Sequence, residues 1–152
     1  MAVPAVGLSP QGMRSADLCG LAEDRIKEAV LLLANHHYTG AAYIAGYAVE
    51  FYLKAILAAQ KYAGFWPLEV IVNEHRTHDL ENLLTMCGLK DRMRAASKTN
   101  VELAMNWQVL RDWRPDIRYR RLRQRLATDI VDAVTATPDG VAHWLRFFQG
   151  EG

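Results

Sequence analysis

A dense run of arginines in the second half of the chain is the strongest chemical signal in the sequence. Residues 111–125 hold seven arginines and only two aspartates, which gives this stretch a net charge of +5. The planar guanidinium group binds phosphate through paired hydrogen bonds and stacks on nucleobases. The seven are Arg111, Arg114, Arg118, Arg120, Arg121, Arg123 and Arg125. If they converge on one open surface, that surface is suited to binding phosphate groups.

Two aromatic residues, Trp113 and Tyr119, lie within this run, where they could act as stacking platforms for bases. A competing interpretation also fits, because runs of like charge are most often solvated faces or pair with carboxylates of the same protein. Both interpretations stay open at this point. Under the first, we expect nucleotide or RNA contacts from five members of the run, which are Arg111, Arg114, Arg118, Tyr119 and Arg121.

An acid–base pair interrupts an otherwise apolar helical segment in the middle of the chain. Glu50 and Lys54 are four residues apart, the spacing at which helical side chains meet. They continue a half-polar stripe that begins with Tyr43, Gly46 and Tyr47. A solvated ion pair would contribute only about 0.3 kcal/mol to stability. A partly buried pair would instead line a functional groove, so both residues are candidate binding residues.

Two histidines precede a short helical segment, in the order His75, His78 and Asp79. They could ligate a metal together with the aspartate, but no further strong ligand lies nearby. Capping of the next helix by Asp79, with His78 packed against the bundle, is the favoured interpretation. The sequence also lacks a Gly-rich phosphate loop, a zinc-protease motif and a nucleophile elbow. We therefore assign no catalytic residue, no metal and no cofactor.

The bulk composition predicts one domain with a sizeable core. The chain has 152 residues, 51% of them hydrophobic, and a net charge of +1. A field over the whole molecule that attracts nucleic acid or lipid is therefore not expected. The two cysteines, Cys19 and Cys87, have no metal-binding or disulfide spacing and predict buried thiols in a reducing cytoplasm. Without an apolar run of about 18 residues, we expect no membrane span.

Helical periodicity, broken by a few glycines and prolines, predicts an all-α, up-and-down bundle of about five helices. The bundle is expected over residues 15–149 and a flexible tail over residues 1–14. The expected helices begin after an N-cap at Ser15, then run over about Ala41–Tyr62, Asp79–Cys87, Lys90–Trp113 and Tyr119–Thr135. A renewed helix at Thr137–Pro138 ends near Phe148. Whether Pro138 kinks or splits this last helix stays open. In the connector after Gly64, a loop is favoured over a brief strand at Glu69–Val72.

Three segments taken together resemble the HEPN domain family. They are AAYIAGYAVEFYLKAIL at residues 41–57, THDLENLL at 77–84 and LRDWRPDIRYR at 110–120. The resemblance runs from about Ala22 to about Phe148. It implies an up-and-down bundle, commonly a homodimer in the cytoplasm, that binds nucleotides or RNA. Many members of the family act as ribonuclease toxins, often encoded beside a minimal nucleotidyltransferase that neutralises them.

The ribonuclease members of that family use an arginine followed, after four to six residues, by a histidine. Neither Arg111 nor Arg114 has a histidine at that distance, because Pro-Asp-Ile-Arg-Tyr occupies the place. Arginine stays protonated and is a poor general base, so this departure favours binding over cleavage. The positions that match the family pattern are expected at the groove or dimer interface, and they are Glu50, Lys54, His78, Asp79, Arg118 and Tyr119.

Three functions follow from these observations. The leading one is a non-catalytic nucleotide- or RNA-binding module, dimeric and working with a minimal nucleotidyltransferase. The second is a divergent, metal-independent ribonuclease toxin that uses His78, or a histidine of a second subunit, in place of the missing one. The third is a protein-interaction module whose apolar helix faces, with Trp107 or Trp113, dock the nucleotidyltransferase.

Overall fold

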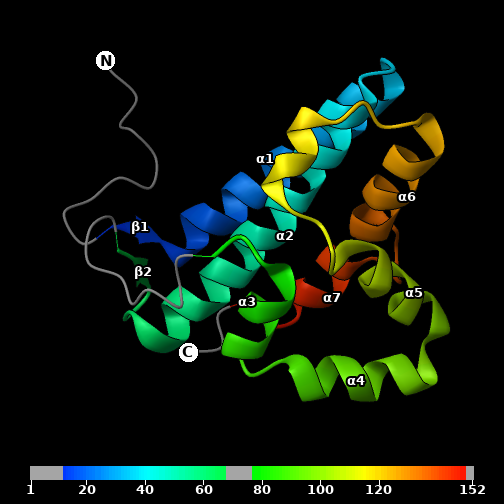
Figure 1. The fold of residues 1–152 in the computed structure, drawn as a ribbon. Helices are drawn as coiled ribbons and strands as arrows, with labels where there is room; N and C mark the ends of the chain where they lie inside the picture. The colour runs from blue at the N-terminus through cyan, green and yellow to red at the C-terminus, as the bar shows by residue number, and fades with distance from the viewer. Residues whose placement is uncertain (1–11, 68–76, 150–152) are drawn as a thin grey trace, which may run out of the picture.

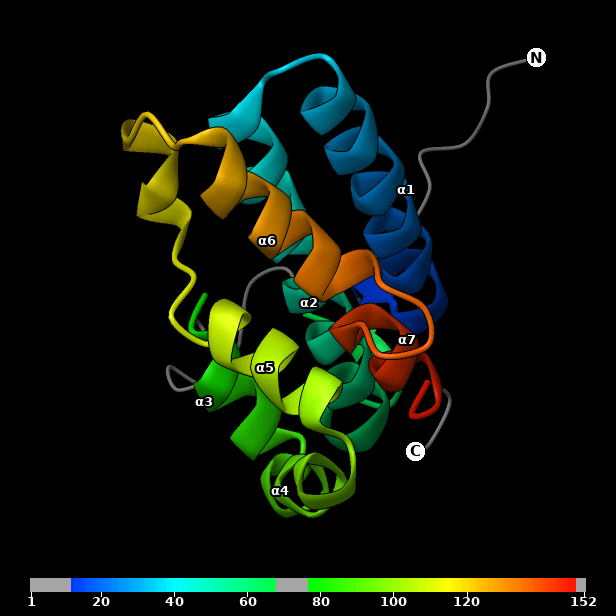
Figure 2. The ribbon, with the colours of Figure 1, turned by 90° about the vertical axis from the view of Figure 1, so that its right-hand side faces the viewer.

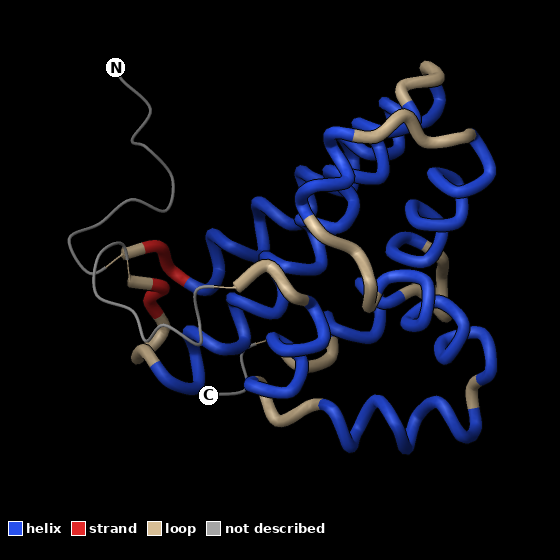
Figure 3. Tube along the Cα trace, in the orientation of Figure 1, coloured by secondary structure: helices blue, strands red, loops and turns tan. Residues whose placement is uncertain are grey.

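The computed structural model describes residues 12–67 and 77–149. Within these ranges, segments rich in alanine, leucine and charged residues form seven α-helices (Figures 1 and 3). The predicted all-α bundle is confirmed, with a tiny two-stranded sheet beside it. The elements are β1 Met13–Arg14, α1 Ser15–Ala34, α2 Tyr38–Lys61, β2 Phe65–Trp66, α3 Leu80–Met86, α4 Lys90–Thr99, α5 Val101–Leu110, the 3₁₀-helix η2 Pro115–Tyr119, α6 Gln124–Thr135 and α7 Val141–Arg146.

Helix α2 is the centre of the bundle. It contacts α1, α3, α6, α7 and η2, and Figure 2 shows α1 and α6 running along it. Thirteen of its residues are buried, and six of these are alanines, whose small side chains let the neighbouring helices approach closely. The helix is long and apolar enough to cross a membrane, but 72% of its most apolar window is buried within the bundle. Burial in the core is sufficient to explain its composition.

The continuous helix predicted over Lys90–Trp113 is wrong, because Asn100 divides it into α4 and α5. The backbone of Asn100 is extended, and its side-chain oxygen accepts a hydrogen bond from the Leu103 amide at 3.0 Å. Its side-chain nitrogen also donates to Asp139 at 2.9 Å. An asparagine that caps one helix and binds a distant loop offers the backbone an alternative to helix continuation. The predicted end is also wrong, since α5 stops at Leu110.

The segment before α6 differs from the prediction as well. A helix was expected from Tyr119, but η2 ends there and α6 begins only at Gln124. After α6, the Thr137–Pro138 peptide bond is cis, and Gly140 is the N-cap of α7. Because α6 ends at Thr135 and α7 begins at Val141, Pro138 lies between two helices, and the alternative of one kinked helix is excluded. Thr137 does not cap α7.

The N-terminal edge is tied to the turn after α2. Met13 and Arg14 pair antiparallel with Phe65 and Trp66, a sheet that the sequence did not predict. Ser15 is not the N-cap of α1, because its hydroxyl donates to the Gly64 carbonyl at 3.1 Å and Arg14 takes the cap position. The possible strand at 69–72 lies outside the described residues.

The two cysteines are free and differ in exposure. Cys87 is buried, as predicted, whereas Cys19 is half-buried. Burial raises the pKa of the Cys87 thiol to about 12. The Cys87 thiol is therefore protonated and inert at neutral pH.

A bidentate ion pair joins the first and last helices. Arg146 donates from Nε and Nη2 to the two carboxylate oxygens of Glu23 at 2.8 and 3.1 Å, and the Tyr52 hydroxyl donates to the same carboxylate. The bonds from Arg146 hold the pKa of Glu23 below its usual range. A carboxylate with a lowered pKa stabilises the fold fully at any pH above its pKa in the unfolded chain, about 4.3. This stabilisation is lost as the pH falls through the pKa of the carboxylate in the folded protein.

We expect Glu23→Gln to lower the free energy of unfolding at pH 7 by about 1 kcal/mol or less, because both partners are about two-fifths exposed. Thermal melts of the two proteins at pH 7 and pH 3 measure this. The difference in melting temperature should shrink at pH 3, where the wild-type carboxylate is becoming protonated. A difference that stays constant between the two pH values would contradict the assignment.

Candidate functional site

A buried carboxylate lies at the centre of the polar stripe on α2. Glu50 is only 1% exposed, and its two oxygens bind two different bases. Lys54 Nζ lies 3.1 Å from Oε2, and His78 Nδ1 lies 2.7 Å from Oε1. The predicted pair of Glu50 and Lys54 is thus a partly buried one, and His78 from the segment before α3 completes a triad. Because a carboxylate accepts hydrogen bonds, Nδ1 of His78 carries a proton and Nε2 is left for another partner.

A row of rings leads from this triad toward the first turns of α2. Tyr47 makes edge contacts with His78 at 6.0 Å and with Tyr43 at 5.1 Å between ring centroids. The guanidinium of Arg118 lies over the Tyr43 ring at 5.9 Å. Burial, with smaller contributions from Tyr43 and the Glu50 carboxylate, raises the pKa of Tyr47 to about 12. Tyr47 is therefore a neutral phenol at physiological pH.

Trp113 anchors the arginine segment to α2. Its side chain is buried at 3% exposure and lies against Gly46. The two are so close that a β-carbon on residue 46 would overlap the indole ring. The indole Nε1 donates to the Ala42 carbonyl at 3.1 Å. The expectation that Trp113 offers a stacking surface to bases is wrong, because its ring is inside the core. Tyr119, the other predicted platform, is 77% exposed and lies beneath Arg118.

Asp79 has two roles at the start of α3. One side-chain oxygen accepts from the Asn82 amide at 3.0 Å, so the predicted capping role is confirmed. The other oxygen binds Arg114 Nη2 at 2.7 Å. Arg114 also donates to the carbonyls of Arg111 and Trp113. This ion pair joins the predicted histidine–aspartate segment to the arginine run and places both beside α2.

The seven arginines do not gather at one point, as convergence on a single surface would require. Arg114 lies at Asp79, Arg118 lies over Tyr43, and Arg121 lies at the α1–α2 turn. Two more line a shallow hollow at the first turn of α6, together with Thr128 and Asp129, and these are Arg123 and Arg125. Within residues 12–67 and 77–149, Arg114 alone of the seven forms an ion pair. These five arginines are spread between Asp79 and the first turn of α6, and we call this arrangement the basic band. Arg114 is the only one of the five that pairs with a carboxylate of the described residues.

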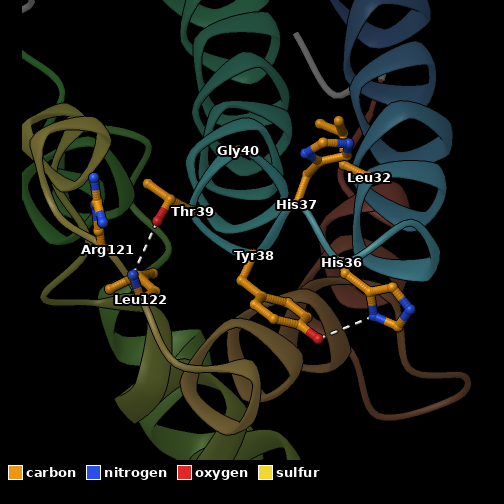
Figure 4. Close-up of a pocket in the computed structure, with 8 residues that line it drawn as sticks. All are labelled: Leu32, His36, His37, Tyr38, Thr39, Gly40, Arg121 and Leu122. Carbon is orange, nitrogen blue, oxygen red and sulfur yellow. Dashed lines mark hydrogen bonds between the residues drawn. The ribbon is translucent and has the colours of Figure 1, made fainter.

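A hollow of about 470 Å³ opens where the arginine segment meets the α1–α2 turn (Figure 4). The Thr39 hydroxyl holds the two together, because it donates to the Arg120 carbonyl at 2.8 Å and accepts from the Leu122 amide at 2.9 Å. No carboxylate lines the hollow. Its lining residues are Leu32, His36, His37, Tyr38, Thr39, Gly40, Arg121 and Leu122.

The structure joins some predicted site residues and separates others. Glu50, Lys54 and His78 form one cluster, and Asp79 with Arg114 borders it, whereas Arg121 lies apart from them at the α1–α2 turn. The hollow at the α1–α2 turn was not predicted, since it exists only after residues 120–122 dock there. His75 lies outside the described residues, and among those that are described no three metal-binding side chains gather.

Comparison with known proteins gives a single positive result. The chain matches the family model described as the HEPN domain over residues 15–137, a range that includes α1 through α6 and every candidate residue named above. No curated protein and no solved structure shows a significant match to the chain.

Proposed function

Since the chain belongs to the HEPN domain family, we propose that it is a non-catalytic module that binds the phosphate groups of a nucleotide or RNA along the basic band. One observation carries this proposal. In the described part of the chain, only Arg114 among the seven arginines of residues 111–125 is paired with a carboxylate. Guanidinium groups that are not neutralised by an intramolecular carboxylate can make bidentate bonds to phosphate.

The extended form of the band favours RNA over a mononucleotide. Its arginines lie at successive places along α2 and the start of α6, as the phosphates of a single strand would. The exposed Tyr119 ring, with Arg118 over it, offers one stacking position beside the band. Isothermal titration calorimetry at low salt with short single-stranded RNA and with nucleoside triphosphates tests this. Absence of heat with both ligands would overturn the proposal.

Removing two guanidiniums from the band should weaken the salt dependence of RNA binding. Each phosphate contact contributes about 0.7 to the slope of log K against log salt on a single strand, so Arg118→Ala with Arg121→Ala should reduce the slope by about 1.4. Titrations at several salt concentrations measure it. Arg94→Ala is the matched control, because this exposed arginine on α4 lies outside the band and should leave the slope unchanged. Equal slopes for all three proteins would argue against phosphate binding by the basic band.

A second function, metal-independent RNA cleavage, is favoured by the triad around Glu50. The buried carboxylate binds Nδ1 of His78, and the His78 side chain is 54% exposed. A histidine oriented in this way can take the proton of a ribose 2′-hydroxyl through Nε2. Under this function His78→Gln should reduce cleavage of a fluorogenic RNA at least about 100-fold, while His143→Gln on α7 should not. A wild-type protein that leaves RNA intact and is harmless on expression would exclude cleavage.

A partner of the nucleotidyltransferase class is supported by family membership alone, and it stays a prediction. The tryptophans expected to dock such a partner do not support it, since Trp107 and Trp113 are 8% and 3% exposed. A minimal nucleotidyltransferase gene beside this one, and co-purification of the two products, would support the partnership. Separate elution of the two proteins would contradict it.

A further inference from the structure

One carboxylate interrupts the basic band at its end beside α3. Asp79 Oδ2 lies 2.7 Å from Arg114 Nη2, and within residues 12–67 and 77–149 this is the only ion pair made by an arginine of the band. The two side chains are 24% and 43% exposed, so the pair lies at the surface. A carboxylate at this distance takes the place that a phosphate oxygen would have on the guanidinium.

The Arg114 guanidinium is fixed by more than this ion pair. Its Nη1 donates to the backbone carbonyls of Arg111 and Trp113 at 3.2 and 2.8 Å. Trp113 is itself buried and bonded to the Ala42 carbonyl on α2. Loss of the Asp79 charge would therefore leave a guanidinium that is still held in place and is no longer neutralised.

We propose that Asp79 is a specificity-determining residue of the basic band, because its carboxylate excludes phosphate groups from Arg114. This inference rests on the function proposed above. A phosphate at Arg114 would meet a like charge already bound there, and such contacts are strongly unfavourable. No carboxylate of the described residues pairs with Arg118 or Arg121. RNA therefore binds from Arg118 onward and stays clear of the end of the band that borders the triad around Glu50.

Asp79→Asn removes the charge and keeps the other role of this residue. Asparagine caps helices about as well as aspartate, so the bond from the Asn82 amide is retained. The variant should gain one phosphate contact, which makes the slope of log K against log salt steeper by about 0.7 and tightens binding of single-stranded RNA about fivefold at about 0.1 M salt. Adding Arg114→Ala to this variant should abolish the gain. Calorimetric titrations at several salt concentrations measure both effects.

Asp116→Asn is the matched control for the change in net charge. Asp116 lies in the same segment, exposed on η2, and in the described part of the chain no arginine pairs with it. Removing its charge opens no guanidinium, and the remaining long-range effect is screened by salt. We expect RNA binding within about twofold of the wild type.

Inorganic phosphate tests the Arg114 site without RNA. In Asp79→Asn, added phosphate should shift the NMR signal of the Arg114 Nε–H group, and in the wild type it should leave this signal in place. Circular dichroism melts check that each variant is folded. Equal shifts in the two proteins, or no shift in either, would overturn the inference.

The RNA titrations separate this inference from the function on which it rests. If neither the wild type nor any variant binds RNA, the proposed function fails, and the phosphate titration still decides whether Asp79 closes Arg114. If the wild type binds RNA and Asp79→Asn has the same slope, the inference is wrong and the proposed function stands. The inference is also wrong if Asp116→Asn tightens binding as much as Asp79→Asn, since loss of any negative charge would then be sufficient.

Discussion

Gly46→Ala should destabilise the protein by about 3 kcal/mol, although alanine is the better helix former. A methyl group at residue 46 would overlap the indole ring of Trp113, which is buried and held by its hydrogen bond to Ala42. Overpacking of a core costs about 1–3 kcal/mol, and loss of the indole bond adds about 1 kcal/mol, more than the gain in helix propensity. Chemical denaturation of the wild type and the variant measures the difference.

Gly20→Ala is the matched control for this prediction. Gly20 also lies inside a helix, but no atom is close to the position where its methyl group would be. We expect this change to stabilise the protein by up to about 1 kcal/mol through helix propensity alone. Combining Gly46→Ala with Trp113→Ala should cost less than the sum of the two single changes, because the overlap is then absent. Strict additivity would show that the two residues do not compete for space.

The same change should affect the basic band. Trp113 holds the start of the segment between α5 and α6 against α2, and Thr39 holds its end. When the Trp113 ring is displaced, Arg114 and Arg118 lose their fixed positions beside Asp79 and Tyr43. We therefore expect weaker RNA binding from Gly46→Ala even under conditions in which the variant is fully folded. Unchanged affinity for RNA would show that binding does not depend on the position of the Trp113 ring.

Glu50→Gln should lower the free energy of unfolding by about 3 kcal/mol. The change removes the only counter-charge of Lys54 within the described residues and leaves a side-chain amide between two nitrogen donors. Breaking a buried ion pair from one side costs about 3–5 kcal/mol, and the value is at the lower end because Lys54 keeps 14% exposure. In a thermal melt this corresponds to a decrease of about 6–12 °C.

Glu28→Gln is the control for this charge removal. Glu28 pairs with Arg25 at 2.6 Å on α1, but its side chain is 47% exposed. An exposed pair contributes less than about 1 kcal/mol, so the melting temperature should change little. If both variants melt at the same temperature, burial of Glu50 has no energetic consequence and the triad is not the centre of the site. Under the cleavage hypothesis, Glu50→Gln should also reduce activity, because His78 loses its orienting partner.

Several features of the site could be read from local spacing. Asp79 was predicted as a cap, and the i, i+4 spacing of Glu50 and Lys54 indicated a pair. Gly46 lies in the middle of an apolar helix, but no packing partner was predicted for it. The ring that fills the space comes from Trp113, 67 residues later, and local pattern does not reveal that partner.

The amino-acid sequence by itself determined that the chain is a helical bundle of the HEPN family, because helical periodicity and the family's motifs are local properties of the chain. The tertiary structure alone decided that His78 completes the triad, that Trp113 is an anchor, and that the arginines form a band. These outcomes depend on contacts between residues far apart in the chain, such as the Asn100 cap bound to Asp139. Such contacts form only when packing offsets the entropy of closing the chain between them, and that balance is a property of the whole fold.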